Sequence, residues 1–255
     1  MAEQKKVYAK EAESVPVVAP ELEEVEVVAV APRIFTAAER ALDAWQPKSE
    51  LGRKVKSGEI TDMSQVLSRG LKIREPQIVD KLLQGLTTNN IMIGQAHGKF
   101  GGGKRRIIKQ TQKKTAEGNK PTFTAMCVVG NGNGYVGVGV GSAKESIPAK
   151  EKALRKAKLN IMAVAMGCGS WKCSCGTKHS LPFEVYGKSG SVEVSLKPAP
   201  KGTGLAVDGE LRKILGAAGY KDLWSKTWGQ TRKKMNFINA TMSALQQATQ
   251  MKVNK

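Results

Sequence analysis

The sequence predicts an α+β fold made of two small domains that join near residues 162–180. Strand-like and helix-like segments follow one another in mixed order, without the regular alternation typical of a parallel α/β sheet. A glycine- and asparagine-rich turn at 130–134 separates two segments of strand character and predicts a hairpin. Amphipathic segments elsewhere in the chain predict surface helices.

Three short helices are expected before residue 70, over 36–45, 48–57 and 63–69. Thr36 and Glu39 have the spacing of a capping box, which marks the start of the first helix. A fourth and clearer helix is expected to open at Glu75-Pro76, because proline suits the first turn of a helix. Its apolar stripe consists of Ile78, Val79, Leu82, Leu83 and Leu86.

A β-hairpin is expected in the middle of the chain, with strands over 122–129 and 135–140 and a weaker strand over 107–114 before them. The glycines at 137, 139 and 141 share one face of the second strand, because side chains alternate across a strand. Either a helix or RNA must approach that face closely, and helix packing is the preferred interpretation. The next helix is expected over 142–160, with Ile147, Ala149, Ala153, Leu154 and Ala157 able to pack inward.

The last third of the chain predicts the second domain. Two strands are expected over 181–186 and 191–197, and a loop rich in proline and glycine follows at 198–204. Helices are expected near 208–217 and 232–249.

The charge of the chain is unevenly distributed. The net charge is +19, yet residues 1–35 hold seven Glu against four basic residues, so residues 36–255 carry +22. Segment 1–35 is interpreted as a flexible tail, with an arm that folds on binding as the alternative. The 40% of hydrophobic residues excludes a wholly disordered chain. The chain lacks an apolar run long enough for a membrane helix, a visible secretory signal and a disulfide scaffold, so we expect a soluble cytoplasmic protein without a membrane partner.

A cluster of cations between residues 99 and 120 predicts an anionic partner. Only Glu117 opposes it, and nearby glycines would let the backbone approach a surface closely. Binding of these cations to phosphates would release counterions, so RNA or DNA is preferred over the alternative of a solvated surface loop. The cluster comprises Lys99, Lys104, Arg105, Arg106, Lys109, Lys113, Lys114 and Lys120.

The sequence contains partial matches to two nucleotide-binding motifs, but neither has the residues or structural context that the motif requires. The GxGxxG match at 132–137 opens a strand, whereas a dinucleotide site needs it to open a helix. The near-match to a P-loop at 98–104 is followed by Arg105, where a Ser or Thr should hold magnesium. The two histidines belong to no recognisable nucleophile–base motif. The sequence therefore predicts a protein that is not an enzyme.

Four potential metal ligands lie within twelve residues, Cys168, Cys173, Cys175 and His179. Three thiolates and one imidazole suit a tetrahedral structural zinc ion, although the spacing differs from the usual pair of CxxC turns. The alternative is a set of reduced thiols in an ordinary turn. Cys127 falls in the middle of a predicted strand and is expected in the core.

Many segments, in register over roughly 40–249, resemble the universal ribosomal protein five of the small subunit, called S-five in bacteria and S-two in eukaryotes. The segments downstream of residue 127 are 128–137, 143–145, 157–161, 167–171, 179–183, 190–192 and 198–204. Upstream, 45–48, 51–52 and 55–56 resemble the extension of the archaeal and eukaryotic branch. The Gly-Cys-Gly-Ser-Trp turn at 167–171 resembles archaeal members in particular.

This resemblance implies an N-terminal domain similar to double-stranded-RNA-binding domains, then a split β-α-β domain, after a helical extension. It implies a ribosome-bound structural protein that binds small-subunit rRNA and contacts ribosomal proteins four and eight. It also implies roles in subunit assembly and in decoding accuracy, near the path by which messenger RNA enters. The expected division is 1–35 acidic tail, 36–73 helical extension, 74–163 first domain, 164–180 cysteine-rich linker and 181–255 second domain.

By position, the hairpin loop that reaches rRNA in this family is 115–121 here. It lacks the family's Gly-Arg-Arg-like run, so we expect the Gly- and Lys/Arg-rich insertion at 94–106 to supply the missing phosphate contacts. The predicted RNA-binding residues are Lys99, Lys104, Arg105, Arg106, Lys109, Lys113, Lys114, Thr115, Gly118, Asn119, Lys120, Asn131, Asn133 and Lys144.

Two rival functions remain at this point. A free-standing RNA-binding regulator would use the same basic surface without binding ribosomes. A zinc-dependent RNA-modifying enzyme would need an open metal position and a general base, whereas three cysteines and one histidine would close the coordination sphere.

Overall fold

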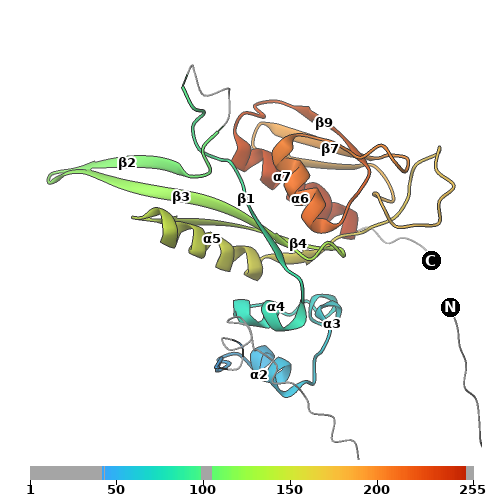
Figure 1. The fold of residues 1–255 in the computed structure, drawn as a ribbon, viewed down its shortest axis with the longest axis horizontal. Helices are drawn as coiled ribbons and strands as arrows, with labels where there is room; N and C mark the ends of the chain where they lie inside the picture. Colours follow the sequence, from blue (N-terminus) through green and yellow to red (C-terminus); the bar gives the residue numbers. More distant parts are fainter. Residues whose placement is uncertain (1–41, 43, 99–104, 251–255) are drawn as a thin grey trace, which may run out of the picture.

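The computed structural model describes residues 42, 44–98 and 105–250 of the chain. The acidic segment 1–35, most of the helix expected over 36–45, and the cations Lys99 and Lys104 lie outside the described residues. Two β-sheets and the helices around them make up the rest, which confirms the predicted α+β class (Figure 1).

The first sheet has five antiparallel strands in the order β1-β3-β4-β5, and β2 pairs with β3 beside that path. Its strands are β1 (Thr87–Asn90), β2 (Lys109–Thr115), β3 (Gly118–Gly130), β4 (Tyr135–Ala143) and β5 (Ile161–Ala163). The hairpin of β3 and β4 around the 130–134 turn is confirmed. The sequence analysis missed β1 and β5, which are short, and β1 is wholly polar and exposed.

β3 is longer than expected and divides into two halves. From Phe123 to Gly130 it pairs with β4, and from Gly118 to Thr124 it pairs with β2. We call the part formed by β2 and residues 118–124 the hairpin arm; in Figure 1 it projects beyond the helices. The loop expected over 115–121 is wrong in length, because the strands are joined by residues 116–117 alone.

Helix α5 (Ser146–Leu159) covers one face of the first sheet and explains the glycine stripe of β4. A Cβ added at Gly139 would overlap the backbone at Ala153 and Ala157, and additions at 137 and 141 meet the same helix. Helix packing is therefore the reason for the glycines. Ala149, Ala153 and Ala157 pack inward as expected, but Ile147 does not: it lies in the first turn, 67% exposed.

The second sheet has the order β6-β7-β9-β8. Its strands are β6 (Val185–Ser189), β7 (Val192–Pro198), β8 (Leu205–Ala206) and β9 (Leu223–Trp228). β8 and β9 are parallel and are connected by α6 (Gly209–Ala218), which makes a β-α-β unit. The final helix, α7 (Lys234–Gln250), lies across β6 and β7. β8 and β9 were not predicted.

Helices α6 and α7 lie between the two sheets (Figure 1). One continuous core joins them, with Val128 of β3, Leu215 of α6 and Leu245 of α7 all fully buried in it. This core contains residues of both expected domains and therefore does not locate a boundary between them. The domain boundaries expected from the sequence stay a prediction. The 130–134 turn also joins the sheets, since Gly132 N and Gly134 N donate to the last carbonyls of α6, those of Ala217 and Ala218, each at 2.9 Å.

Three helices precede the first sheet, α2 (Glu50–Ser57), α3 (Met63–Ser68) and α4 (Pro76–Leu82), close to the ranges predicted; the first two form the helical extension. Glu75 fastens it, because its carboxylate accepts from Trp45 Nε1 at 2.9 Å and from Ser49 N at 2.6 Å. Burial alone would raise the pKa of Glu75, but these hydrogen bonds lower it. Asp80 of α4 pairs with Lys158 of α5 at 2.6 Å and so attaches α4 to the helix that covers the first sheet. Among the described residues, no helix is both long and apolar enough to cross a membrane.

Candidate RNA-binding surface and metal centre

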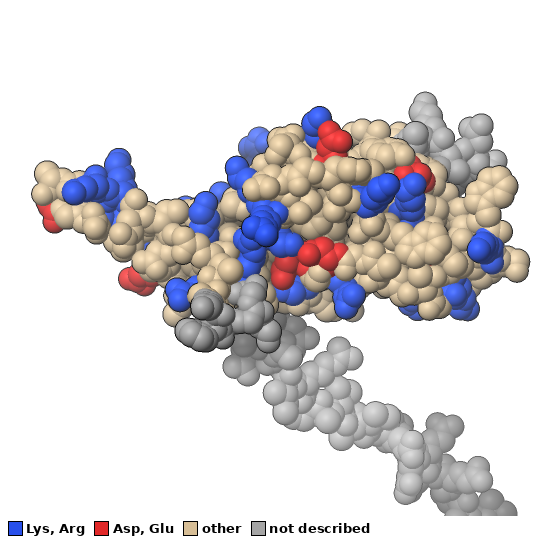
Figure 2. Space-filling view, turned by 90° about the horizontal axis from the view of Figure 1, so that it is seen from above, with Lys and Arg blue, Asp and Glu red and all other residues tan. Residues whose placement is uncertain are grey.

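The hairpin arm concentrates exposed cations on two strands. Lys109, Lys113 and Lys114 of β2 and Lys120 of β3 are all exposed. Lys113 lies directly opposite Lys120 in the register, a like-charge pair that destabilises a hairpin. Glu117 in the turn relieves part of this repulsion through an ion pair with Lys120 at 2.8 Å. Figure 2 shows basic side chains gathered towards the narrow end of the molecule.

The other predicted residues of this segment lie at the tip of the arm. Thr115 Oγ1 donates to the carbonyl of Gly118 at 2.8 Å across the turn. Gly118 has a φ of +119°, a backbone conformation that favours glycine. Asn119 is exposed beside them, opposite Lys114. The tip therefore presents small and polar groups between lysines.

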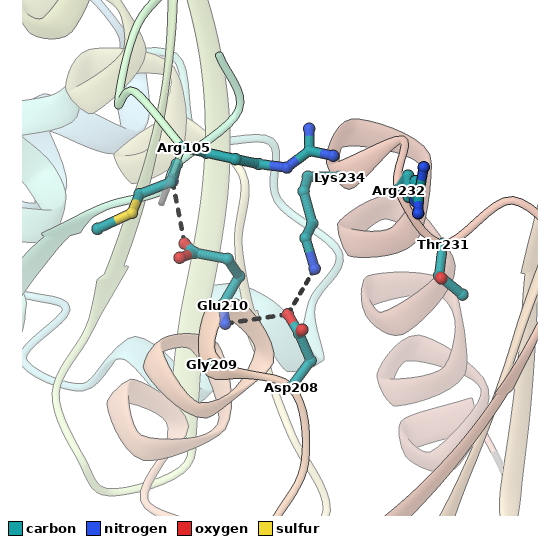
Figure 3. A pocket seen from close by; sticks show the side chains of 8 residues that line it. Arg105, Asp208, Gly209, Glu210, Thr231, Arg232 and Lys234 are labelled. Atoms are coloured by element: carbon teal, nitrogen blue, oxygen red, sulfur yellow. Dashed lines mark hydrogen bonds and ion pairs between the residues drawn. The ribbon is translucent and has the colours of Figure 1, made fainter. Parts of the chain in front are cut away.

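Arg105 lies at a second place, a cavity of about 390 Å³ at the N-terminal ends of α6 and α7 (Figure 3). Asp208 in that cavity accepts from Lys234 Nζ at 2.8 Å, and Glu210 accepts from Lys213 Nζ and from Met92 N, both at 3.0 Å. The acids are thus engaged, whereas Arg105 and Arg232 form no ion pair within the described part of the chain. Arg106 follows Arg105 and is exposed.

The sequence analysis missed Arg232 as part of this basic surface. It is 127 positions from Arg105 in the sequence, and no motif surrounds it. The fold brings the two residues to one cavity, which the sequence alone does not show.

Asn131 and Asn133 lie far from the arm, at the other end of β3, about 40 Å away by the rise of a strand. Asn131 Oδ1 accepts from Asn133 N at 2.8 Å and from Tyr135 N at 3.2 Å, so this side chain fixes the turn. Asn133 is exposed, and so is Lys144, which lies between β4 and α5. The structure thus divides the predicted RNA-binding residues among separate places.

The four predicted metal ligands do come together. The ligand atoms of Cys168, Cys173, Cys175 and His179 all lie within 4.8 Å of one another. His179 Nε2 is 3.3 Å from Cys168 Sγ and 3.6 Å from Cys173 Sγ. Cys175 Sγ is 3.7 Å from Cys168 Sγ and 2.9 Å from Cys173 Sγ. A hydrogen bond from Cys173 lowers the pKa of the Cys175 thiol to about 6, which favours the thiolate that binds metal.

The loop that carries these ligands, residues 167–180, is closed by backbone hydrogen bonds. Gly167 N donates to Ser180 O at 2.8 Å, and Ser180 N donates back to Gly167 O at 2.9 Å. We call this segment the cysteine loop. Gly169 lies against Pro182, where an added Cβ would overlap the backbone, so glycine lets the loop approach the start of the second sheet.

His179 is buried and oriented by Asp222. Its Nδ1 is 2.8 Å from Asp222 Oδ2, which directs Nε2 towards the three thiols. Such a carboxylate fixes the ring and raises the basicity of a metal-binding histidine. Burial by itself would raise the pKa of Asp222, but the Gly204 N–H and His179 lower it further than burial raises it.

The donor set fits a structural metal ion. Three thiols and one imidazole are ligands of tetrahedral zinc, and a Zn–S bond of about 2.3 Å places tetrahedral ligand atoms about 3.5–3.8 Å apart. Most of the separations above lie near that range, with Cys173 and Cys175 somewhat closer. Four protein ligands leave no open position for a reacting water.

Comparisons with known proteins identify the family of the chain. The family models described as ribosomal protein S5, N-terminal domain, and ribosomal protein S5, C-terminal domain, match residues 107–165 and 187–254. A small ribosomal subunit protein uS5 from Nanoarchaeum equitans is 48% identical, over 83% of this chain and 91% of the relative. The uS5 protein of Methanocaldococcus jannaschii is 46% identical over 80% and 87%. That of Thermoplasma acidophilum is 44% identical over 83% and 89%.

Proposed function

Since this chain belongs to the ribosomal protein S5 family, as a uS5 protein of the small ribosomal subunit, we propose that it binds small-subunit rRNA chiefly through its hairpin arm. Family membership makes the chain a non-catalytic, structural constituent of the ribosome. The rRNA contacts, the finer roles and the bound metal below are our proposal.

The observation that carries the proposal is the construction of the arm. Two strands without a third neighbour are marginally stable alone, and here two lysines face each other across them. Every residue of β2 from Lys109 to Lys114 is exposed, so the arm buries little apolar surface of its own. A polyanion between these lysines would replace their repulsion with attraction and would order the arm.

The recognition would be electrostatic and geometric. Lysine contacts to phosphates position a protein on RNA without reading its sequence. The arm is an extension of β3, whose other half is held between α5 and α6. A rigid base of this kind fixes the distance and direction at which the lysines meet the RNA backbone. Arg105, Arg106, Arg232 and Lys144 would extend the contact along the molecule.

Subunit assembly, decoding accuracy near the path by which messenger RNA enters, and contacts with ribosomal proteins four and eight belong to the same proposal. They are supported by the family resemblance. The two sheets joined through α6 and the 130–134 turn would act as a spacer between rRNA helices.

The cysteine loop would hold a structural Zn²⁺ through Cys168, Cys173, Cys175 and His179. When bound, the ion would supply a cross-link, since the closed donor set has no place for substrate. Asp222 would keep His179 in the orientation that binds it.

A sucrose gradient tests the proposal. The tagged full chain, expressed in an archaeal host, should sediment with small subunits and polysomes at low salt, and RNase should release it. Recovery in the top fractions with intact RNA would contradict ribosome binding. It would favour a free-standing RNA-binding regulator.

A further inference from the structure

The second sheet leaves one of its faces open. Helices α6 and α7 lie on the inner face, where Gly187 of β6 meets Ala240 and Ala244 of α7. The opposite face, which we call the outer face, carries three exposed aromatic side chains, Tyr186, Trp224 and Trp228. Their exposed fractions are 58%, 43% and 42%. Large aromatic side chains exposed together mark a binding site more often than solitary ones do.

The strand register places lysines among these rings. Lys226 stands between Trp224 and Trp228 on the same face of β9, because side chains alternate along the strand. Its Nζ lies 5.3 Å from the ring centroid of Trp228. Across the sheet, Lys197 of β7 is opposite Trp224, and the small Ser195 is opposite Lys226. Lysines therefore stand beside the rings, and Ser195 between them is fully buried beneath its neighbours.

The acids of the outer face are already engaged. Glu184 accepts from Lys197 Nζ at 3.0 Å and from Ser195 Oγ at 2.7 Å. Glu193 pairs with Lys188 at 2.7 Å. Among the described residues Lys226 forms no ion pair, and its Nζ lies over the Trp228 ring, so the unpaired charge of this face is positive. Such a surface complements a phosphate rather than a cationic or neutral partner.

A cavity of about 520 Å³ continues the outer face towards the cysteine loop. Trp224, Phe183 and Pro198 supply its apolar walls, and Lys172 and Lys197 are also among its lining residues. Trp171 of the cysteine loop borders it with a side chain that is fully exposed, at 103%. Glu184 lines it too, paired with Lys197, so the lining combines aromatic and apolar walls with Lys172, which is unpaired within the described part of the chain.

We propose that the outer face, with Trp171, Trp224 and Trp228, is a stacking surface for unpaired nucleotides of RNA. A four-stranded sheet with exposed aromatic rings is a recurring platform for single-stranded RNA, because every base has a face that stacks. A protein partner is less favoured, because the centres of protein interfaces are depleted in lysine, whereas each of these tryptophans has a lysine nearby. The inference rests on the proposed RNA-binding function and adds a second mode to it.

Equilibrium binding of the full chain to two RNAs of equal length, an unstructured single strand and a blunt duplex, tests the proposal. The double variant W224A/W228A should lose about 10-fold or more in affinity for the single strand, since removing one base stack by alanine substitution costs roughly 1–3 kcal/mol. Its affinity for the duplex should stay within about 2-fold. The aromatic variant W224F/W228F should retain most single-strand binding, whereas the matched W224L/W228L, apolar but without a stacking ring, should not.

The hairpin-arm variant K113A/K114A/K120A separates this proposal from the function it rests on. It should weaken the affinity for the duplex. When W224A/W228A is added to it, the affinity for the single strand should still fall about 10-fold. If the wild-type chain bound no duplex but the tryptophan effect remained, the proposed function would fail and the stacking surface would stand. If W224A/W228A melted at the wild-type temperature and bound each RNA with the wild-type affinity, the stacking proposal would be overturned.

If W224A/W228A bound both RNAs normally, but small subunits that contain it lacked a neighbouring ribosomal protein, the stacking proposal would also be overturned. The outer face would then be a protein-docking surface.

Discussion

The two sheets of this chain meet their surroundings in opposite ways. In the first sheet, the part shared by β3 and β4 is covered by α5 on one side and α6 on the other, and the charged hairpin arm extends into solvent. In the second sheet, helices cover only the inner face among the described residues. The outer face, which no described helix covers, carries exposed tryptophans. The first sheet thus presents exposed lysines on a narrow arm, whereas the second presents a broad aromatic face with few unpaired charges.

Glycine determines how each sheet is covered. Three glycines of β4 admit the backbone of α5, and Gly187 of β6 admits α7 in the same manner. On the uncovered side of the second sheet the alternate positions of β9 carry Trp224 and Trp228. Glycine thus stands where the backbone of a helix comes closest to a strand, and the two tryptophans stand on the face of β9 that no helix of the described chain covers.

The largest effect is expected from Gly139→Ala, which closes the space that α5 occupies. The new Cβ would overlap backbone atoms at Ala153 and Ala157 and lie 2.7 Å from Lys156 C, and backbone cannot move aside as a side chain can. We expect a loss of about 3 kcal/mol or more in the free energy of unfolding, at the upper end of overpacking effects. Denaturant unfolding measures it.

Gly216→Ala is the matched control. Gly216 lies within α6 with nothing near its added Cβ, so the change should stabilise the chain by about 0.5–1 kcal/mol. Equal destabilisation by both changes would contradict the close packing of α5 on β4.

Removal of the metal should have the next largest effect, on the cysteine loop beside the second sheet. A cross-link that closes a loop of this length contributes about 2–3 kcal/mol, so a chelator should lower the Tm by roughly 4–12 °C. Cys175→Ser should do the same and abolish zinc binding. Asp222→Asn should keep the ligands but weaken zinc binding about 10- to 100-fold.

Cys127→Ser serves as the control for metal content. This buried cysteine lies in β3 outside the cluster, and burial raises the pKa of its thiol. Metal analysis by mass spectrometry should find zinc unchanged in this variant. A wild-type chain purified without zinc that also fails to bind added zinc would contradict the metal centre.

The smallest effect concerns Glu184 on the outer face. The hydrogen bond from Ser195, with those from Tyr186 and Lys197, lowers the pKa of Glu184 from 4.5 to about 2. A lowered pKa in the folded state means that this stabilisation is present above pH 4.5 and is lost as the pH falls towards 2. The side chain is 31% exposed, so solvent reduces the contribution to about 1 kcal/mol or less.

Glu184→Gln should flatten the acid limb of the stability curve between pH 4.5 and pH 2. Ser195→Ala should flatten it in the same direction, because it removes the main donor. Thermal unfolding across that pH range measures both. An acid limb identical in all three proteins would show that Glu184 makes no such contribution.

Apolar stripes, caps and glycine turns predicted most of the helices, the β3–β4 hairpin and β7. The buried run at the end of β3 is continuous, because α5 and α6 cover its two faces. The strand expected over 181–186 overlaps β6 only at residues 185–186. β9 escaped prediction because its pattern is inverted. Tryptophans occupy its exposed positions, while Ser225 and Thr227 point towards the covered side. β1 escaped because all four of its residues are polar and exposed.

The candidate sites likewise differed in how well the sequence predicted them. The four metal ligands are close in sequence, so their spacing predicted the cluster. The spacing could not predict Asp222, because it is 43 positions from His179 in the sequence and only the fold brings the two side chains together. Arg232 and the outer-face tryptophans likewise belong to sites that the packing of distant segments creates.

The salt dependence of rRNA binding tests most directly whether the hairpin arm is the main site of phosphate binding. The wild-type chain and K113A/K114A/K120A would be titrated with a small-subunit rRNA fragment at several salt concentrations. Removing one lysine–phosphate interaction should reduce the slope of log K against log salt by about one, so we expect the variant's slope to be smaller by about three, with weaker binding at low salt. An unchanged slope and affinity in a variant that folds normally would contradict the assignment of RNA binding to the arm.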